Sequence, residues 1–151
     1  MDKPAVDLLI PTPEDMHAVR QIFQEYADSL SIDLKFQGFE TELAHLPGEY
    51  SGPRGQILLA RVNGSIAGCC ALRPLDDCDY PNAVEMKRLY VRKAFRGLGL
   101  GRQLVEAMLD TARQAGYDHV LLDTLDDMEA ARTLYEELGF ESIEPYYHNP
   151  L

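Results

Sequence analysis

Hydrophobic positions in the first third of the chain follow a strand spacing and then a helical spacing. A short apolar run at residues 5–10 predicts a first strand. Thr12 and Pro13 then suit an N-cap and a first helical position, and Asp15 completes a pattern close to a capping box. A second, shorter helix is predicted at residues 39–46, where a Pro-Gly pair ends it. Apolar positions at helical spacing predict the buried stripe of the first helix: Met16, Val19, Ile22, Phe23 and either Tyr26 or Ala27.

The middle of the chain has the pattern of a strand meander. Two apolar runs flank Asn63 and Gly64, a residue pair favoured in tight hairpin turns because both positions tolerate positive φ. We expect strands at Gln56–Val62 and Ser65–Leu75. After an acidic loop, a third strand is expected at residues 84–91.

The last third alternates between helical and strand patterns. Residues 102–116 carry apolar side chains on one helical face and end at a glycine. A nearly all-apolar segment at 119–124 predicts a strand buried on both faces, 127–140 another helix, and 141–147 a last strand. The predicted order is β-α-α-β-β-β-α-β-α-β, an α/β fold with a β-α-β crossover. Without repeats or long linkers in the sequence, we expect a single domain over residues 1–151.

Composition and charge narrow the class of function. The net charge is −11, from 14 basic and 25 acidic residues, which disfavours a nucleic-acid partner or an anionic membrane partner. The sequence has neither a long apolar run nor a signal-cleavage pattern, so we expect a cytoplasmic protein. The cysteines Cys69, Cys70 and Cys78 form no CxxC pair, and the histidines are scattered. We therefore expect reduced thiols and no metal site.

The segment RGLGLGR, from Arg96 to Arg102, places glycines at every second position where a strand joins a helix. Unpaired N–H groups and the helix dipole at a helix start favour an anion, and glycines let a phosphate approach the backbone. Six basic residues and no acidic one occur between Lys87 and Arg102. This local charge in an acidic chain favours a small polyanionic ligand.

Two common phosphate-binding motifs do not match this segment, and a turn without a ligand is a further alternative. A Walker A loop needs Gly-Lys-Ser/Thr, which the sequence lacks. A dinucleotide fingerprint needs a third glycine, but Gly99 and Gly101 are followed by Arg-Gln-Leu. A glycine-rich turn with no ligand stays open on the glycines alone, because short glycine motifs are weak signals.

The longer segment LYVRKAFRGLGLGRQLV resembles the central motif of the GCN5-related N-acetyltransferase (GNAT) superfamily. The family pattern is Arg/Gln-x-x-Gly-x-Gly/Ala, and Arg96, Gly99 and Gly101 occupy its fixed positions. Together with LYEELGF downstream, the resemblance runs from about residue 84 to 140. It implies a mixed, mostly antiparallel central sheet with helices on both faces. It also implies acetyl transfer from acetyl-CoA, as co-substrate, to an amine.

The resemblance implies two parts of a CoA site. In the family the strand carrying LYV separates from its neighbour, and its free backbone groups bind the pantetheine arm. That strand segment is Leu89, Tyr90 and Val91. The pyrophosphate is bound by N–H groups of the glycine loop, which here comprises Arg96, Gly97, Leu98, Gly99, Leu100, Gly101 and Arg102.

Two side chains are candidates for proton transfer. Tyr135 matches the tyrosine that many family members use as general acid towards the CoA sulfur, although its helical face also suits a core aromatic. Glu85 lies, by strand alternation, on the face of Lys87, Leu89 and Val91, and family members often place a basic carboxylate on this strand. The alternative is an exposed glutamate paired with Lys87 or Arg88.

The acceptor, a small-molecule or peptide amine, is not specified by the sequence. Residues 36–50 and the acidic loop at Asp76, Asp77 and Asp79 are expected to face it, and the net charge favours a cationic acceptor. Tyr146 and Tyr147 could line the acceptor pocket or cover the sheet. The last strand of the family is expected to be missing or very short, because the chain stops at PYYHNPL, and an unpaired edge there would invite a homodimer. A PYYHNP-like ending suggests a bacterial origin.

The sequence therefore predicts an acetyl-CoA-dependent N-acetyltransferase that works by direct attack in a ternary complex, because no cysteine is placed to carry an acetyl group. A non-catalytic acyl-CoA-binding sensor is the alternative. An ordinary nucleotide-binding fold, taking ATP or NAD, is a third class.

Overall fold

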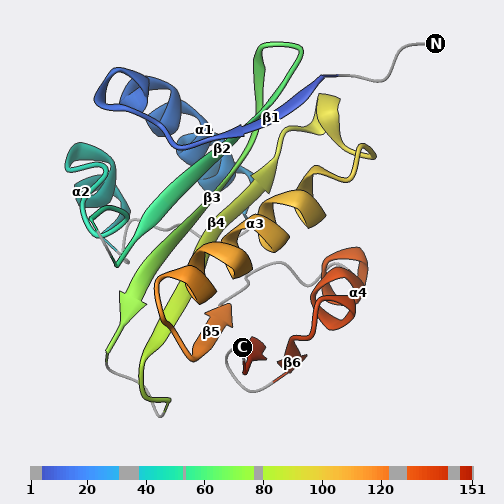
Figure 1. Ribbon diagram of the computed structural model, residues 1–151. Coiled ribbons are helices and arrows are strands. Elements are labelled where there is room, and N and C mark those ends of the chain that lie inside the picture. The colour runs from blue at the N-terminus through green and yellow to red at the C-terminus, as the bar shows by residue number, and fades with distance from the viewer. Residues whose placement is uncertain are drawn as a thin grey trace.

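A single continuous sheet organises the chain in the computed structural model, which describes residues 5–30, 38–52, 54–76, 80–122, 129–142 and 147–150 (Figure 1). Among these residues the sheet has seven strands in the order β1-β2-β3-β4-β5-β7-β6. Neighbouring strands pair antiparallel except β4 with β5, which are parallel. The strands are β1 (Val6–Leu9), β2 (Gln56–Val62), β3 (Ser65–Leu75), β4 (Ala83–Val91), β5 (His119–Leu122), β6 (Glu141–Ser142) and β7 (Tyr147–Asn149).

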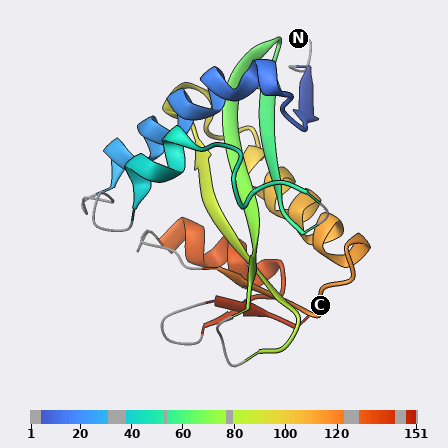
Figure 2. The ribbon, with the colours of Figure 1, turned by 90° about the vertical axis from the view of Figure 1, so that its left-hand side faces the viewer.

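Helices cover both faces of the sheet, as the sequence predicted. Helices α1 (Met16–Ser29) and α2 (Phe39–Ala44) lie on one side of the strands, and α3 (Leu100–Gln114) lies on the other (Figure 2). The fourth helix, α4 (Glu129–Glu137), packs Tyr135 into the same buried cluster as α3. The mixed, mostly antiparallel sheet with helices on both faces is therefore confirmed.

The predicted stripe of α1 is buried against the sheet. Met16, Val19, Ile22 and Phe23 are at most 8% exposed and join Phe39 of α2 in one cluster. Thr12 and Asp15 contact each other as expected: the Thr12 N–H donates to the Asp15 carboxylate at 2.8 Å, and the Thr12 hydroxyl donates to the same carboxylate at 3.0 Å. These contacts lie at a 3-10 turn at Pro13–Asp15, so the α-helix itself begins at Met16.

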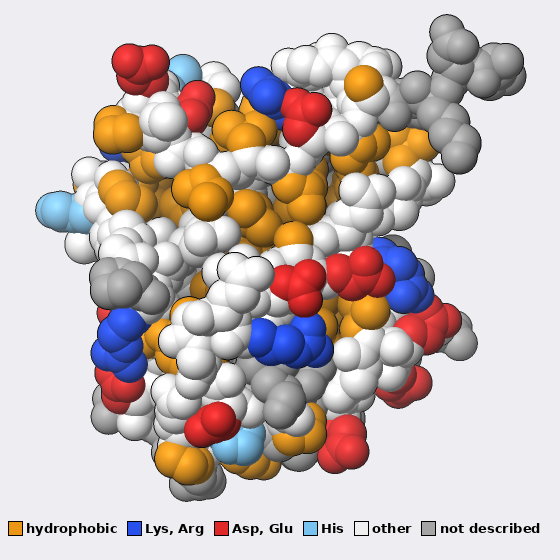
Figure 3. All heavy atoms as spheres, in the orientation of Figure 1, with side chains coloured by type: hydrophobic (Ala, Val, Ile, Leu, Met, Phe, Trp, Pro, Cys, Tyr) orange, Lys and Arg blue, Asp and Glu red, His pale blue; other side chains and the backbone are white. Residues whose placement is uncertain are grey.

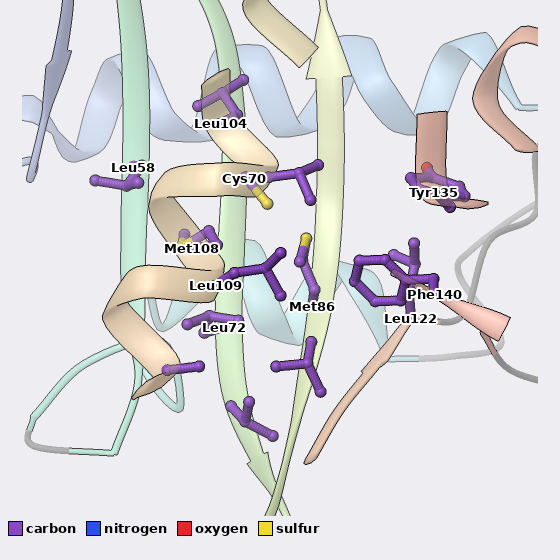
Figure 4. Close-up of a cluster of buried hydrophobic side chains, with 14 of the residues drawn as sticks. Leu58, Cys70, Leu72, Met86, Leu104, Met108, Leu109, Leu122, Tyr135 and Phe140 are labelled. Carbon is purple, nitrogen blue, oxygen red and sulfur yellow. The ribbon is translucent and has the colours of Figure 1, made fainter. Parts of the chain in front are cut away.

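The larger cluster fills the space between the sheet and α3. Figure 4 shows Leu104, Met108 and Leu109 of α3 pointing towards side chains of β2, β3 and β4. Helix α3 starts at Leu100, two residues earlier than predicted, because Gly99 adopts a left-handed conformation at the N-cap and Gly101 then falls inside the helix. The hairpin between β2 and β3 turns at Asn63 and Gly64, both with positive φ, and both strands have the predicted bounds.

The C-terminal part departs from the single strand expected at residues 141–147. It contains two short strands, and β7 lies between β5 and β6 by pairing antiparallel with both. The last strand of the fold is thus present and very short, with three residues. Residues 143–146, including Tyr146, lie outside the described residues.

Candidate active site

The central strand β4 carries a bulge at Arg88, directly before the LYV segment. Ala71 of β3 pairs with Lys87, and Cys69 pairs with Tyr90, so Cys70 alone faces two residues, Arg88 and Leu89. Arg88 has a φ of 60°, in the left-handed region that non-glycine residues rarely occupy. An inserted residue of this kind locally bends the strand and re-aims the residues after it.

The bulge exchanges the two faces of β4. Before it, Val84 and Met86 pack in the α3 cluster; after it, Leu89 and Val91 pack there, while Tyr90 packs with α1. The prediction that Glu85 shares a face with Leu89 and Val91 is therefore wrong. The prediction assumed that successive residues of the strand point to opposite faces. A bulge adds one residue to β4 with no partner of its own on β3, and the residues after it therefore change faces.

Contacts from four side chains stabilise Arg88 in its left-handed backbone conformation. Its side chain, only 4% exposed, donates from Nε and Nη2 to the two carboxylate oxygens of Glu42 on α2, at 2.9 and 2.8 Å. The guanidinium carbon lies 5.8 Å from the Tyr26 ring centroid and 5.4 Å from that of Phe39. The Cys69 thiol donates to the Arg88 carbonyl oxygen, with Sγ to O of 3.1 Å. The bulge is thus fixed by side chains from α1, α2 and β3.

The described pairing of β4 with β5 covers the part of β4 before the bulge. The parallel ladder joins Ala83–Met86 to His119–Leu122, and residues 123–128, which follow β5, lie outside the described residues. On its other side β4 stays paired with β3 as far as Val91. Leu89, Tyr90 and Val91 lie on the part of β4 after the bulge, where the sequence analysis expected the pantetheine arm.

The glycine loop that follows has the backbone shape of an anion site. Gly97 and Gly99 have φ of 88° and 77°, and a Cβ built on either would have no neighbour within 4 Å. Glycine is therefore favoured at these two positions by the positive φ of the backbone, because a side chain there would not clash with a neighbour. Leu98 is among the most exposed large apolar side chains, at 41%. The loop ends at the N-terminus of α3, where helical N–H groups are unpaired.

The expected positive patch is largely compensated by acids from distant segments. Arg88 pairs with Glu42, and Arg92 pairs with Glu25 of α1 at 2.6 Å. Arg102 pairs with Glu106 and with Glu137 of α4. On the face shown in Figure 3, acidic and basic side chains lie interspersed. Within the described residues, Lys93 and Arg96 have no ion-pair partner, and Arg96 Nε donates to the Val91 carbonyl at 3.0 Å.

Tyr135 lies in the core, as its helical pattern predicted. It is 4% exposed, and its ring meets that of Phe140 edge to face, with centroids 5.9 Å apart (Figure 4). The residue before it, Leu134, is the nearest neighbour of Gly101, at 3.7 Å from a Cβ built there. Helix α4 thereby brings Tyr135 close to the start of α3. Its role as general acid stays a prediction.

Glu85 is neither exposed nor paired with Lys87 or Arg88, so that part of the expectation is wrong. It is 2% exposed and accepts a hydrogen bond from Nε of Arg73 at 2.7 Å. Arg73 lies directly opposite it on β3 and also pairs with Glu49 at 3.0 Å. The sequence analysis missed Arg73, although the register of the meander could have placed the two residues opposite each other. The guanidinium compensates a buried charge that would otherwise be strongly unfavourable.

A polar pocket of about 320 Å³ opens on the α2 side of the bulge. It is formed by α2, the turn that follows it, β3 and β4, and its charged lining residues are Glu42, Glu49, Arg73, Lys87 and Arg88. The segment expected to face the acceptor, residues 36–50, contributes Gly38, Thr41, His45 and Tyr50 to this lining. Burial lowers the pKa of Lys87 from its ordinary value, against the opposing effect of Glu85.

Other expected residues lie away from this pocket or outside the described part. Asp76 forms an exposed ion pair with Arg54, in agreement with a solvated acidic loop. Cys78 and the neighbouring loop aspartates, Asp77 and Asp79, lie outside the described residues. Cys69 and Cys70 are fully buried free thiols, and burial raises the pKa of both.

The pattern of the acetyltransferase (GNAT) family matches residues 16–140. The chain belongs to this family. A protein of Schizosaccharomyces pombe named as an uncharacterized N-acetyltransferase is 41% identical over 94% of this chain and 86% of its own length. N-acetylaspartate synthetase of Rattus norvegicus is 34% identical over 68% of this chain and 34% of its own. A GNAT acetyltransferase of Brucella melitensis, solved with acetyl-CoA, superposes with a TM-score of 0.75 at 18% identity, covering 97% and 88% of the two chains.

Family membership identifies this GNAT protein as an acetyl-CoA-dependent acyltransferase, with acetyl-CoA as its co-substrate. Its relatives include eukaryotic proteins, so the bacterial origin stays a prediction. In the part of the chain that the structure describes, no helix is long and apolar enough to cross a membrane. Within the same residues, no group of three or more His, Cys, Asp or Glu side chains could hold a metal ion.

Proposed function

We propose that this GNAT protein transfers an acetyl group from acetyl-CoA to a primary amine by direct attack in a ternary complex. The observation that carries the proposal is the position of the β4 bulge. It lies between the polar pocket, lined by Lys87 and Arg88, and the segment Leu89–Val91, which leads into the positive-φ glycine loop. Acetyl-CoA would lie along that segment with its pyrophosphate at the start of α3, which offers unpaired N–H groups.

The step itself needs no covalent enzyme intermediate. The neutral amine nitrogen attacks the thioester carbonyl, forming a C–N bond; the C–S bond then breaks, the nitrogen loses a proton, and the CoA thiolate gains one. A backbone N–H at Leu89 to Val91 would stabilise the developing oxyanion. The described cysteines support direct attack, because Cys69 and Cys70 are buried and their raised pKa disfavours the nucleophilic thiolate.

In this proposal Tyr135 protonates the leaving thiolate, and Glu85 receives the amine proton through water. Tyr135 is supported by its place on α4 beside the start of α3. Glu85 is supported by its carboxylate on β4, two residues before Lys87, which lines the pocket. Its ion pair with Arg73 makes it a weaker candidate than Tyr135, because the guanidinium already engages one carboxylate oxygen.

The test is CoA-thiol release from acetyl-CoA with a broad panel of amines. Tyr135→Phe keeps the ring and is expected to lower kcat by about 10²-fold while retaining CoA affinity. Tyr117→Phe is the matched control, since it also removes a buried tyrosine hydroxyl, here bonded to the Arg54 carbonyl, and is expected to leave kcat unchanged. For Glu85, the readout is the pH profile of kcat: Glu85→Gln should alter it, whereas Glu49→Gln, which removes the other Arg73 partner, should not.

The alternative is a non-catalytic acyl-CoA-binding sensor. Tight CoA binding with no turnover on any amine, together with identical behaviour of Tyr135→Phe and the unaltered protein, would favour the sensor and refute the enzyme.

The likeness to a protein named for making N-acetylaspartate supports an amine acceptor of small size.

A further inference from the structure

The pocket beside the bulge contains three cations, and one of them has no carboxylate within ion-pair distance among the described residues. Two of its three cations are guanidinium groups, and both are bound by carboxylates: Arg88 by Glu42, and Arg73 by Glu49 and Glu85. The third is Lys87. Among the described residues no hydrogen bond or ion pair reaches its ammonium group, although its side chain is half-buried and lines the pocket.

We propose that Lys87 binds a carboxylate of the acceptor, and that the acceptor is a small amino acid or a closely related amino acid derivative with a free acid group. This inference rests on the proposed function, because it assumes that the polar pocket holds the amine. An ammonium group that is half removed from water is stabilised by an anionic partner, and the pocket supplies the acidic partners of Arg73 and Arg88 but none for Lys87.

The distance along β4 limits how far the acid group lies from the amine. Lys87 immediately precedes Arg88, the bulged residue, and consecutive Cα atoms are about 3.8 Å apart. A carboxylate held by Lys87 would therefore lie within one lysine side-chain length of the bulge. The pocket volume, about 320 Å³, suits a molecule of amino-acid size.

The charges that line the pocket matter more for the choice of acceptor than the net charge of the chain. The value of −11 led to the expectation of a cationic acceptor, but charges on the far surface are screened over about 8 Å at physiological ionic strength. The groups that a bound acceptor meets are the pocket residues, where acids and cations are matched and Lys87 is left to face the ligand. A zwitterionic acceptor satisfies both signs of charge in this lining.

The experiment compares each free amino acid with its own amide, using thiol release from acetyl-CoA. The unaltered protein is expected to show a kcat/KM at least about 10-fold higher for the free acid of its best acceptor than for the matching amide. Lys87→Met should remove that preference by raising KM for the acid alone. Lys87→Arg should retain part of it, and Lys87→Glu should favour the amide.

Arg113→Gln is the control, because Arg113 is an exposed cation near the end of α3, paired with Asp110 and away from the pocket. It is expected to leave the acid preference intact. Equal rates on acid and amide with the unaltered protein would overturn the inference while leaving the proposed acetyltransferase in place. So would a Lys87→Met variant that loses both activities equally yet melts normally. A lack of turnover on every amine would instead overturn the proposed function, and this inference with it.

Discussion

At the scale of single residues, Gly99 is the position where backbone conformation alone decides the outcome. Its φ is 77° and a Cβ would meet no neighbour, so alanine there is opposed only by the left-handed backbone. That conformation costs a non-glycine residue roughly 1–2 kcal/mol. The loop can relieve this strain only by rotating its N–H groups away from a bound pyrophosphate.

We therefore predict that Gly99→Ala weakens CoA binding by about 10-fold or more, as measured by calorimetry. Gly64→Ala is the matched control: it has a φ of 84° and equally open space, but lies in the β2–β3 hairpin. It should lose similar stability and keep its CoA affinity. Equal losses of affinity in the two variants would show that the glycine loop is not the binding element.

The buried thiols give a second prediction at this scale. Burial raises the pKa of Cys70 to about 12 and that of Cys69 well above its ordinary value. A raised thiol pKa lowers the thiolate fraction near neutral pH, and only the thiolate is alkylated efficiently. In a Cys78→Ser background at about pH 8, we expect native Cys69 and Cys70 to react with iodoacetamide at least about 100-fold more slowly than after denaturation. Timed alkylation followed by mass spectrometry measures this, and rapid labelling of the native protein would contradict it.

At the scale of elements, the attachment of α2 to β4 depends on one buried ion pair. Arg88 is 4% exposed, and its guanidinium group donates to both carboxylate oxygens of Glu42. Removing one member of a buried pair leaves an uncompensated charge, which typically costs about 3 kcal/mol or more. The added contacts of Tyr26 and Phe39 to the same guanidinium do not replace that charge.

Glu42→Gln should accordingly lower the melting temperature by roughly 6–12 °C, given about 2–4 °C per kcal/mol for a chain of this size. Asp76→Asn, which breaks the exposed pair with Arg54, should leave the melting temperature nearly unchanged. Calorimetry of the two variants side by side decides between them. Similar melting temperatures would mean that the Glu42 pair contributes no more than a surface contact.

Elements defined by local pattern were predictable from sequence, and features that depend on distant partners were not. The Asn63–Gly64 turn and the apolar runs on either side of it predicted the bounds of β2 and β3 correctly. The β4 bulge was missed because regular alternation was assumed through VEMKRLYV, although the adjacent Lys87 and Arg88 interrupt it, and the register there depends on β3. The acids that compensate Arg88, Arg92 and Arg102 lie on α2, α1 and α4, so a count of charges along the chain overestimated the positive patch.

At the scale of the whole molecule, a ligand that binds only the folded state must raise its stability. At a concentration of 100 times its dissociation constant the gain is about 2.7 kcal/mol, or roughly 5–11 °C for a domain of this size. We expect CoA to produce a shift of this order in differential scanning fluorimetry. ATP and NAD at the same concentration should produce much smaller shifts, and a loss of affinity of about 10-fold in Gly99→Ala should cut the shift from CoA to about half. A shift from NAD equal to that from CoA would favour an ordinary nucleotide-binding fold.

The short C-terminal edge bears on assembly. Within the described residues the outermost strand, β6, has two residues, and this described part offers little unpaired backbone to a second copy. The homodimer expected from an open edge there stays a prediction, and this edge gives it less support than the sequence suggested.

The clasp between Glu42 and Arg88 has a consequence for anyone who would change which amine this protein accepts. Helix α2 lines the pocket that we propose for the acceptor, and its Glu42 also binds Arg88 of β4, next to the proposed acyl site. A mutant library that varies the whole helix would therefore disable most members before their selectivity could be read. A library that keeps Glu42 and Arg88 constant and randomises Thr41, His45 and Glu49 would change the pocket lining while the ion pair stays in place.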